Sequence, residues 1–194
     1  KSLPQAKADM AEVKQFATDV LGIDNPQSWD LPYASEKLRE AKYAYSDQEV
    51  KQYFTEPAVF KGLFGLVERL FGITIVAAEA PVWHPDVKFF RIQNEAGEKI
   101  AEFYMDLYAR ANKRGGAWMD NDRVRNRLNG ILETPIAYLV CNFSKPVGGK
   151  PALLTHDDVL TLFHEFGHGL HHMLSKVDAP AASGINGVEW DAVE

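Results

Sequence analysis

The sequence predicts an α+β fold that is mostly helical and has a small, mainly antiparallel sheet. Apolar residues recur at steps of three and four over residues 1–72 and again after residue 155, which is the helical period. Between residues 73 and 150 they form short runs or alternate with polar residues, as strands do. Helices followed by strands and another helix favour α+β over a doubly wound sheet. We therefore predict a helical segment 1–72, a sheet segment 73–150 and a final segment 151–194.

Helices are expected throughout the first segment. One apolar stripe stops at Gly22, and its members are Met10, Val13, Phe16 and Val20. The residues Trp29–Tyr33 then lead into a charged helix that continues through Tyr45. Ser46 and Glu49 have the spacing of a capping box, which marks another helix start. The last stripe stops at Gly72 and consists of Phe60, Leu63, Val67 and Leu70.

Four strands are expected in the middle of the chain. They are Ile73–Ala77, Val87–Ile92, Ile100–Tyr108 and Pro135–Ser144, and the second and third flank a hairpin turn at Asn94–Gly97. The third strand alternates apolar and polar residues, so it should have one buried face and one polar face. The loop Arg114–Trp118 contains one Arg-Gly-Gly, which we interpret as a turn or a loop packed near a site rather than as an RNA-binding element.

Composition limits the class of protein. The chain has 194 residues, is 46% apolar and carries a net charge of −6, so it is globular and has no nucleic-acid footprint. No run approaches the roughly 18 apolar residues of a membrane span. The single cysteine, Cys141, excludes an internal disulfide and is expected to be a small buried side chain in a reducing, cytoplasmic compartment. Because the chain lacks an initiator methionine and a terminating signal, we expect an internal piece of a longer protein.

The most informative motif is His-Glu-Phe-Gly-His at residues 164–168. On a helix, positions four apart share one face, so His164 and His168 can bind one metal ion. Glu165 stands beside them and can take a proton from a water activated by that metal. Thr155 and Asp158 predict the helix start through a capping box. A buried stripe is expected on the opposite face: Val159, Phe163, Phe166, Leu170 and Met173. Gly167 and Gly169 inside the helix predict close approach by a neighbouring element or a ligand.

A catalytic zinc usually has three protein ligands and one open position. The residues alone leave the third ligand open among His171, His172, Asp178, Glu189, Asp191 and Glu194. A straight helix cannot bring three side chains spread over eight residues to one tetrahedral centre. His171 and His172 should therefore line the cleft, support the ligands or simply be solvated. The third ligand should come from another element, and Glu189 and Glu194 are the carboxylates available after the loop.

Several segments resemble the thimet oligopeptidase family of zinc metallopeptidases, most closely its bacterial oligopeptidase A branch. They are Phe163–His168, Ser183-Gly184, Asp191–Glu194, Leu107–Arg110, Lys113–Met119, and Trp29-Asp30 with Tyr33, so the resemblance runs from about Trp29 to Glu194. Ala34 departs slightly from the family, since a second tyrosine often follows Tyr33 there. The resemblance implies that His164, His168 and Glu194 bind one zinc ion per chain and that Glu165 is the general base.

The resemblance also implies a fold and a substrate class. Members of the family are mostly helical and two-lobed, and they cleave short peptides in a deep channel. Their oxyanion-binding tyrosines and histidine lie beyond the third ligand, so this chain would be an incomplete catalytic domain that is nearly inactive alone and self-associates through exposed core. We expect Pro135–Ser144 to pair with the peptide substrate. Two alternatives remain: another zinc peptidase with two histidines and one glutamate, and a non-catalytic zinc-binding module.

Overall fold

The structure, a computed structural model, describes residues 2–44 and 47–189. The chain divides into two compact units, Lys1–Val50 and Lys51–Glu194, and each is described by itself. The prediction of three segments, 1–72, 73–150 and 151–194, concerns the order of helices and strands rather than these units, and it stays a prediction.

The first unit is a pair of packed helices, α1 (Leu3–Asp19) and α2 (Leu31–Tyr43). Among the residues of this unit whose burial is described, two alanines are buried, Ala17 and Ala34, and their small side chains let the helices approach closely. Both helices have proline in the first turn, where the missing amide hydrogen costs nothing. The charged helix predicted to reach Tyr45 ends at Tyr43, because Ala44 adopts a left-handed conformation with φ 56°.

The short helix α3 (Asp47–Lys51) lies at the boundary between the two units. The predicted capping box with Glu49 needs Ser46, which lies outside the described residues. The next helix, α4 (Glu56–Phe71), carries the predicted stripe, of which Phe60, Leu63 and Val67 are buried and Leu70 is exposed. It ends at Gly72 as predicted, and this glycine has φ 63°.

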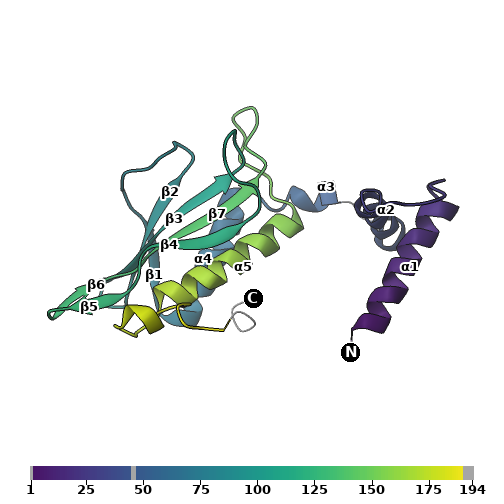
Figure 1. The fold of residues 1–194 in the computed structure, drawn as a ribbon. Coiled ribbons are helices and arrows are strands. Elements are labelled where there is room, and N and C mark those ends of the chain that lie inside the picture. The colour runs from purple at the N-terminus through teal and green to yellow at the C-terminus, as the bar shows by residue number, and fades with distance from the viewer. Residues whose placement is uncertain (1, 45–46, 190–194) are drawn as a thin grey trace. The chain divides into compact units, whose positions relative to one another are not determined.

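The second unit is built on a five-stranded mixed sheet with the order β1-β2-β3-β7-β4 (Figure 1). These strands are β1 (Thr74–Ala77), β2 (Lys88–Gln93), β3 (Lys99–Tyr108), β4 (Trp118–Arg123) and β7 (Ile136–Phe143). Only the β3–β7 pair is parallel, so the prediction of an α+β fold with a mainly antiparallel sheet is confirmed. A separate hairpin consists of β5 (Asn126–Leu128) and β6 (Ile131–Glu133), joined through Asn129 and Gly130, both of positive φ.

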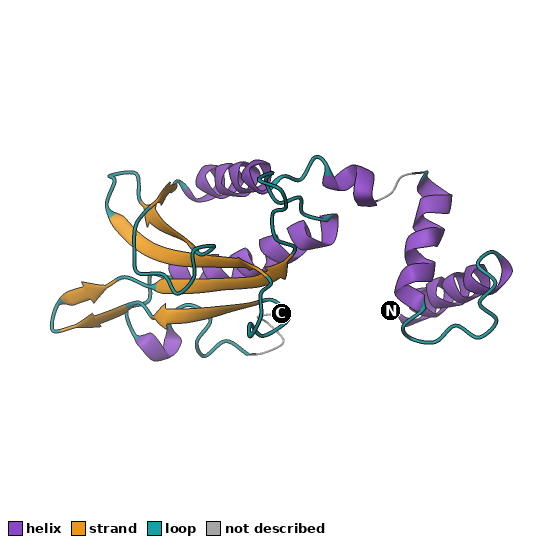
Figure 2. Ribbon diagram, turned by 90° about the horizontal axis from the view of Figure 1, so that it is seen from above, coloured by secondary structure: helices purple, strands orange, loops and turns teal. Residues whose placement is uncertain are grey.

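Two helices cover one face of this sheet, and Figure 2 shows the two layers from above. They are α4 and α5 (His156–Met173). Phe103 of β3 contacts both, since its ring centroid lies 6.2 Å from that of Phe64 on α4 and 5.5 Å from that of Phe166 on α5. The core therefore lies between the sheet and these helices, and α5 packs mainly on β7 and β4.

One face of β3 is more buried than predicted. The apolar residues Ala101, Phe103, Met105 and Leu107 are buried as expected, but the opposite face is largely buried too. Arg91 and Lys99 form ion pairs with Glu102, and Trp83, Arg110 and Lys113 cover Asp106. The polar side chains of this strand are therefore paired under other residues rather than solvated.

The centre of this polar layer is a buried ion pair between Asp106 and Lys113. The Lys113 side chain is 5% exposed, and its Nζ donates to an Asp106 carboxylate oxygen at 2.9 Å and to the Cys141 carbonyl at 2.6 Å. Burial alone would raise the pKa of Asp106, but hydrogen bonds from Arg110, Lys113 and Trp83 lower it to about 2. Lys113 therefore connects the loop after β3 to β3 itself through Asp106 and to the neighbouring strand β7 through the Cys141 carbonyl.

Replacing Lys113 by methionine is expected to lower the free energy of unfolding by about 3–5 kcal/mol, because a buried carboxylate loses a buried cation. Denaturant titration measures this loss. Lys99→Met is the matched control, since Lys99 pairs with Glu102 at 40% exposure and should contribute about 1 kcal/mol or less. Equal effects of the two substitutions would contradict the buried-pair interpretation.

Strand β7 was expected at Pro135–Ser144 and is found at Ile136–Phe143. The expectation that it pairs with a substrate peptide is wrong, because β7 is hydrogen-bonded to β3 on one side and to β4 on the other. The sheet edge on this side is β4, which was not predicted as a strand.

Cys141 of β7 is fully buried as predicted, and burial is the main cause that raises the pKa of its thiol to about 12.

Candidate metal centre

The predicted start of the motif helix α5 is confirmed. The Thr155 amide donates to Asp158 Oδ2 at 2.8 Å, and the Asp158 amide donates to Thr155 Oγ1 at 3.0 Å, which completes the capping box.

The prediction of the buried stripe on α5 is only partly right. Phe166 and Met173 are buried, but Phe163 is 37% exposed, and Leu162 and Gly169 are buried in its stead. The buried face is rotated because α5 leans on β7 and β4.

The two histidines of the motif converge. His164 is exposed and His168 is partly exposed, one turn apart on the outer side of α5. Their Nε2 atoms are 2.9 Å apart, and their rings are perpendicular with centroids 4.5 Å apart. Two nitrogen ligands of a tetrahedral zinc, each about 2.1 Å from the ion, lie about 3.4 Å from each other. A shift of a few tenths of an ångström would therefore place both nitrogens on one ion.

Glu165 lies on the flank of the helix that faces the sheet. It is 7% exposed, and its charge raises the pKa of Cys141 on β7, after the larger effect of burial. A carboxylate with so little exposure is only weakly solvated. This position is compatible with the predicted function as a general base, which needs limited solvation and a nearby water.

The structure narrows the list of third ligands. Glu194 and Asp191 lie outside the described residues, and no group of three histidine, cysteine, aspartate or glutamate side chains able to hold a metal occurs within residues 2–44 and 47–189. Asp178 already accepts hydrogen bonds from two arginines. His172 is buried, whereas His171 and Glu189 are exposed. The choice of Glu194 rests on the family resemblance.

His172 connects the motif helix to the end of β4. Its Nε2 atom lies 2.9 Å from the carbonyl oxygen of Arg123, the last residue of β4, and its Nδ1 has no hydrogen-bond partner in the described part of the chain. Gly184 packs against the same ring, since a Cβ on Gly184 would stand 3.0 Å from Nδ1 and 2.9 Å from the His172 Cα. The predicted supporting position of His172 is thus a contact with strand and loop backbone.

Burial lowers the pKa of His172 below its ordinary value of 6.5, more than the hydrogen bond to Arg123 raises it. The unfolded chain then binds a proton more readily than the folded protein, so this contribution to stability is present above pH 6.5 and is lost as the pH falls through the pKa of folded His172.

We expect the thermal midpoint of the metal-free protein to fall more between about pH 7.5 and about pH 5 than that of the His172→Gln variant, whose amide can still donate to the Arg123 carbonyl. Parallel pH profiles would contradict this.

The two glycines in α5, Gly167 and Gly169, differ in how closely other atoms approach them. Gly169 lies against the sheet, where an added Cβ would meet Leu139 Cδ2 at 3.0 Å, so close approach is confirmed there. Gly167 has no atom within 4 Å of such a Cβ among the described residues, so the expected close neighbour is not found. A larger side chain at Gly169 would push the helix off β7.

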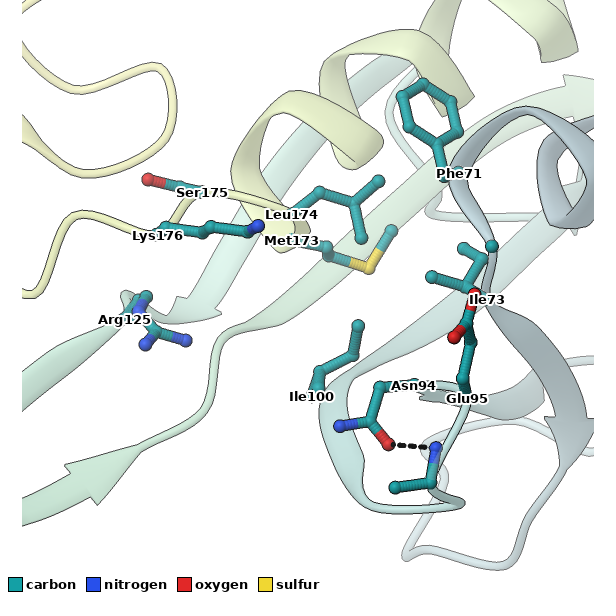
Figure 3. Close-up of a pocket in the computed structure, with 12 residues that line it drawn as sticks. Phe71, Ile73, Asn94, Glu95, Ile100, Arg125, Met173, Leu174, Ser175 and Lys176 are labelled. Carbon is teal, nitrogen blue, oxygen red and sulfur yellow. Dashed lines mark hydrogen bonds between the residues drawn. The ribbon is translucent and has the colours of Figure 1, made fainter.

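A cavity of about 850 Å³ lies beyond the C-terminal end of α5. Its apolar lining includes Phe71, Ile73, Ile100, Met173 and Leu174, and Arg125 and Lys176 lie on one side of it (Figure 3). None of the predicted site residues that the structure describes lines this cavity. The histidine pair on α5 is therefore not part of this cavity.

Sequence reasoning missed one part of the site region. Asp178 was considered only as a metal ligand, whereas it accepts hydrogen bonds from Arg125 and Arg127. The signal available in the sequence was the pair of arginines two residues apart, but their partner is 51 residues away from Arg127 in the chain. No local pattern reports such a contact.

Two histidines four residues apart on a helix, with a glutamate between them, are typical of the metallopeptidase class. The chain belongs to peptidase family M3, whose model matches residues 1–194. The resemblance stated from the sequence is confirmed.

Relatives agree with this family. Oligopeptidase A of Escherichia coli (strain K12) is 50% identical over 196 residues, which cover 100% of this chain and 29% of that protein. Organellar oligopeptidase A of Arabidopsis thaliana is 46% identical over 97% of this chain and 25% of its own length. A dipeptidyl carboxypeptidase of Salmonella typhimurium is 42% identical over 92% of this chain and 26% of its own length. The chain thus spans less than a third of the curated relatives that it matches.

Proposed function

We propose that the protein containing this chain is a zinc-dependent endopeptidase that hydrolyses short oligopeptides. The observation that carries the proposal is the convergence of the His164 and His168 Nε2 atoms, 2.9 Å apart, on a helix that also holds the buried Glu165. The names of the relatives support peptides as the substrate class. The substrate range and the metal are part of the proposal.

The proposed functions of the residues follow from their chemistry. His164, His168 and Glu194 hold the metal, which when bound supplies a Lewis acid that polarises a water molecule and the scissile carbonyl. Glu165 accepts a proton from the attacking water and donates it to the leaving amine. The outer edge of β4, which no described strand occupies, offers backbone amides and carbonyls to an extended peptide. It takes the place of β7 in our hypothesis of substrate pairing.

Further proposals concern the rest of the protein. Since the relatives are more than three times longer, we propose a larger, two-lobed and mostly helical peptidase in which this chain supplies the zincin-like helix and the metal ligands. The chain alone would be nearly inactive, because the family's oxyanion donors lie beyond the third ligand and losing one such donor costs about 10²–10³ in rate. Self-association of the isolated chain is also part of the proposal, and it would use the apolar side chains exposed on α4 and α5: Leu66, Leu70, Phe71, Leu160 and Phe163.

None of the described helices is long and apolar enough to cross a membrane. A cytoplasmic location stays a prediction from the cysteine usage.

Metal removal tests the proposal. The complete gene product is expected to hydrolyse a fluorogenic peptide of fewer than about ten residues, to lose that activity on dialysis against a chelator and to regain it with stoichiometric zinc. The 194-residue chain, assayed in parallel, should show almost none. Activity that survives complete metal removal would refute the metallopeptidase proposal. Zinc held without any peptidase activity in the complete protein would favour the non-catalytic module, and cleavage of large folded proteins would favour a different zinc peptidase.

A further inference from the structure

The two histidines of the motif belong to a longer row of histidines on α5. His164, His168 and His172 are spaced four residues apart, and their exposure falls along the row: His164 is exposed, His168 is partly exposed and His172 is 1% exposed. Four residues turn an α-helix about 40° past one full turn, so the row winds around the helix as it advances. It therefore runs from solvent, where His164 and His168 form what we call the ligand pair, into the contact between α5 and the sheet.

The buried end of this row contacts the end of the edge strand. His172 Nε2 lies 2.9 Å from the carbonyl oxygen of Arg123, the last residue of β4. Because a carbonyl oxygen can only accept, the ring proton of this bond is on Nε2. The helix also packs on β4, and Figure 1 shows α5 running alongside this strand. One hydrogen bond thus joins the helix of the ligand pair to the strand that we propose binds the peptide.

The end of β4 is irregular where His172 meets it. The pairing of β4 with β7 shifts register between Asn121 and Arg123, so that Asn121 lies opposite Ala137 and Arg123 opposite Ile136. A bulge of this kind bends a strand and interrupts its hydrogen bonds to the neighbour. On its outer side β4 has no neighbouring strand in the part of the chain that the structure describes. The direction of the strand end therefore depends in part on its contact with α5.

The ring of His172 has little room to move. It is buried, and on its other side a Cβ placed on Gly184 would stand 3.0 Å from Nδ1. Gly184 has φ 62°, which a residue with a side chain rarely adopts, so this close approach is built into the backbone. Within residues 2–44 and 47–189, Nδ1 has no hydrogen-bond partner, and the bond to the Arg123 carbonyl is the one that the ring makes. The ring is therefore a fixed spacer between the helix and the strand end.

Contacts along α5 give the distance from the ligand pair to this strand end. Gly169, which directly follows the second member of the pair, lies against the sheet where a Cβ would stand 3.0 Å from Leu139 Cδ2. Leu139 is paired with Met119 of β4, four residues before Arg123. A peptide that adds to a sheet pairs with its neighbour residue by residue. A peptide along β4 would thus reach the strand end about four residues from the ligand pair.

We propose that His172 is a positioning residue that strengthens the binding of longer peptides: through the Arg123 carbonyl it holds the end of β4 in line with the ligand pair. The inference deepens the proposed function and rests on it for the substrate, whereas the contact itself lies within the described residues. His172 acts through the strand and does not touch the reacting atoms. A side chain that only stabilised the fold would affect short and long peptides alike.

The test compares two substitutions of similar size in the complete protein. His172→Gln keeps a donor for the Arg123 carbonyl, and His172→Met does not. His156→Met is the matched control, since His156 is exposed in the first turn of the same helix. Steady-state kinetics are measured on two fluorogenic peptides of about four and about eight residues, the longer one extended equally on both sides of the same cleaved bond. Hydrogen exchange of the amides at the end of β4 is followed in the metal-free protein.

We expect His172→Met to raise KM for the longer peptide about five- to tenfold, which is the effect of one net hydrogen bond. The kcat should stay within about twofold, KM for the shorter peptide should be unchanged, and exchange at the end of β4 should become faster. His172→Gln should recover most of both effects, and His156→Met should show neither. Equal changes for the two peptides, or equal losses in His172→Gln and His172→Met, would overturn the positioning role.

The proposed function and the role of His172 fail in different ways. If the unsubstituted protein hydrolyses neither peptide, the proposed function is wrong and the effect on substrate binding is lost with it. If it hydrolyses both but exchange at the end of β4 is unchanged in His172→Met, His172 does not hold the strand. Should His172→Met not fold, Gly184→Ala displaces the ring from the other side and is expected to raise KM for the longer peptide alone.

Discussion

The substitution Glu165→Gln is expected to lower kcat of the complete protein on a short peptide by about 10²–10⁴ while zinc remains bound. Glutamine has the shape of glutamate but cannot accept a proton from water, so the loss should appear in the chemical step. Glu165 is nearly buried beside the two histidines and is adjacent to His164 in sequence, yet the proposed ligand set does not use it. Steady-state kinetics together with the zinc content of the purified protein measure both halves of this expectation.

Asp157→Asn is the matched control for Glu165→Gln. Asp157 is exposed in the first turn of the same helix, so its substitution removes one charge from α5 without touching the motif. It should leave kcat nearly unchanged. If Glu165→Gln retained most of its activity, or lost its zinc, the general-base assignment would be wrong.

Zinc binding is the second large effect, and Glu194→Gln is expected to weaken it by more than the roughly 10–100-fold that loss of a supporting residue costs. Glutamine offers a neutral oxygen in place of an anionic ligand, which binds a divalent cation less strongly. Titration calorimetry of the 194-residue chain and of the complete protein gives the affinity and the stoichiometry, which should be one zinc per chain.

Glu189→Gln is the control for this measurement, because Glu189 is the other carboxylate that the sequence left open as third ligand. It is exposed at the end of the described chain. A large effect of Glu189→Gln with a small effect of Glu194→Gln would reverse the assignment drawn from the family resemblance. If both variants bound zinc as tightly as the unsubstituted protein, neither glutamate would bind the metal.

Much of the fold could be predicted because local signals were strong. The Thr155–Asp158 capping box fixed the start of α5, the turn at Asn94–Gly97 joined β2 to β3, and Gly72 ended α4. Strands β5 and β6 were missed because each has only three residues. Strand β4 was missed because most of its side chains are polar, and its pairing with β7 rather than its own residues makes it a strand.

In the candidate site, too, features set by local sequence were predicted and features set by distant contacts were not. The 164–168 spacing alone predicted that His164 and His168 share a helix face, since one helical turn decides it. The exposure of Phe163 was not predicted, because helical periodicity gives the width of an apolar stripe but not the angle at which the sheet meets it. The arginines on Asp178 depend on a contact across 53 and 51 residues, which only the folded chain brings together.

The position of β7 has a consequence for the order of folding. The chain leaves β3, forms β4 at the edge and the β5–β6 hairpin, and only then inserts β7 between β3 and β4. In the folded sheet β3 pairs with β7 and not with β4, so we expect the sheet to close only when β7 arrives, through the parallel contact between Phe103 and Ala137. The motif helix α5 is the next element, so during synthesis the two histidines leave the ribosome only after β7, the last strand of the sheet on which α5 packs. We therefore expect binding of the proposed metal to follow closure of the sheet rather than to guide it.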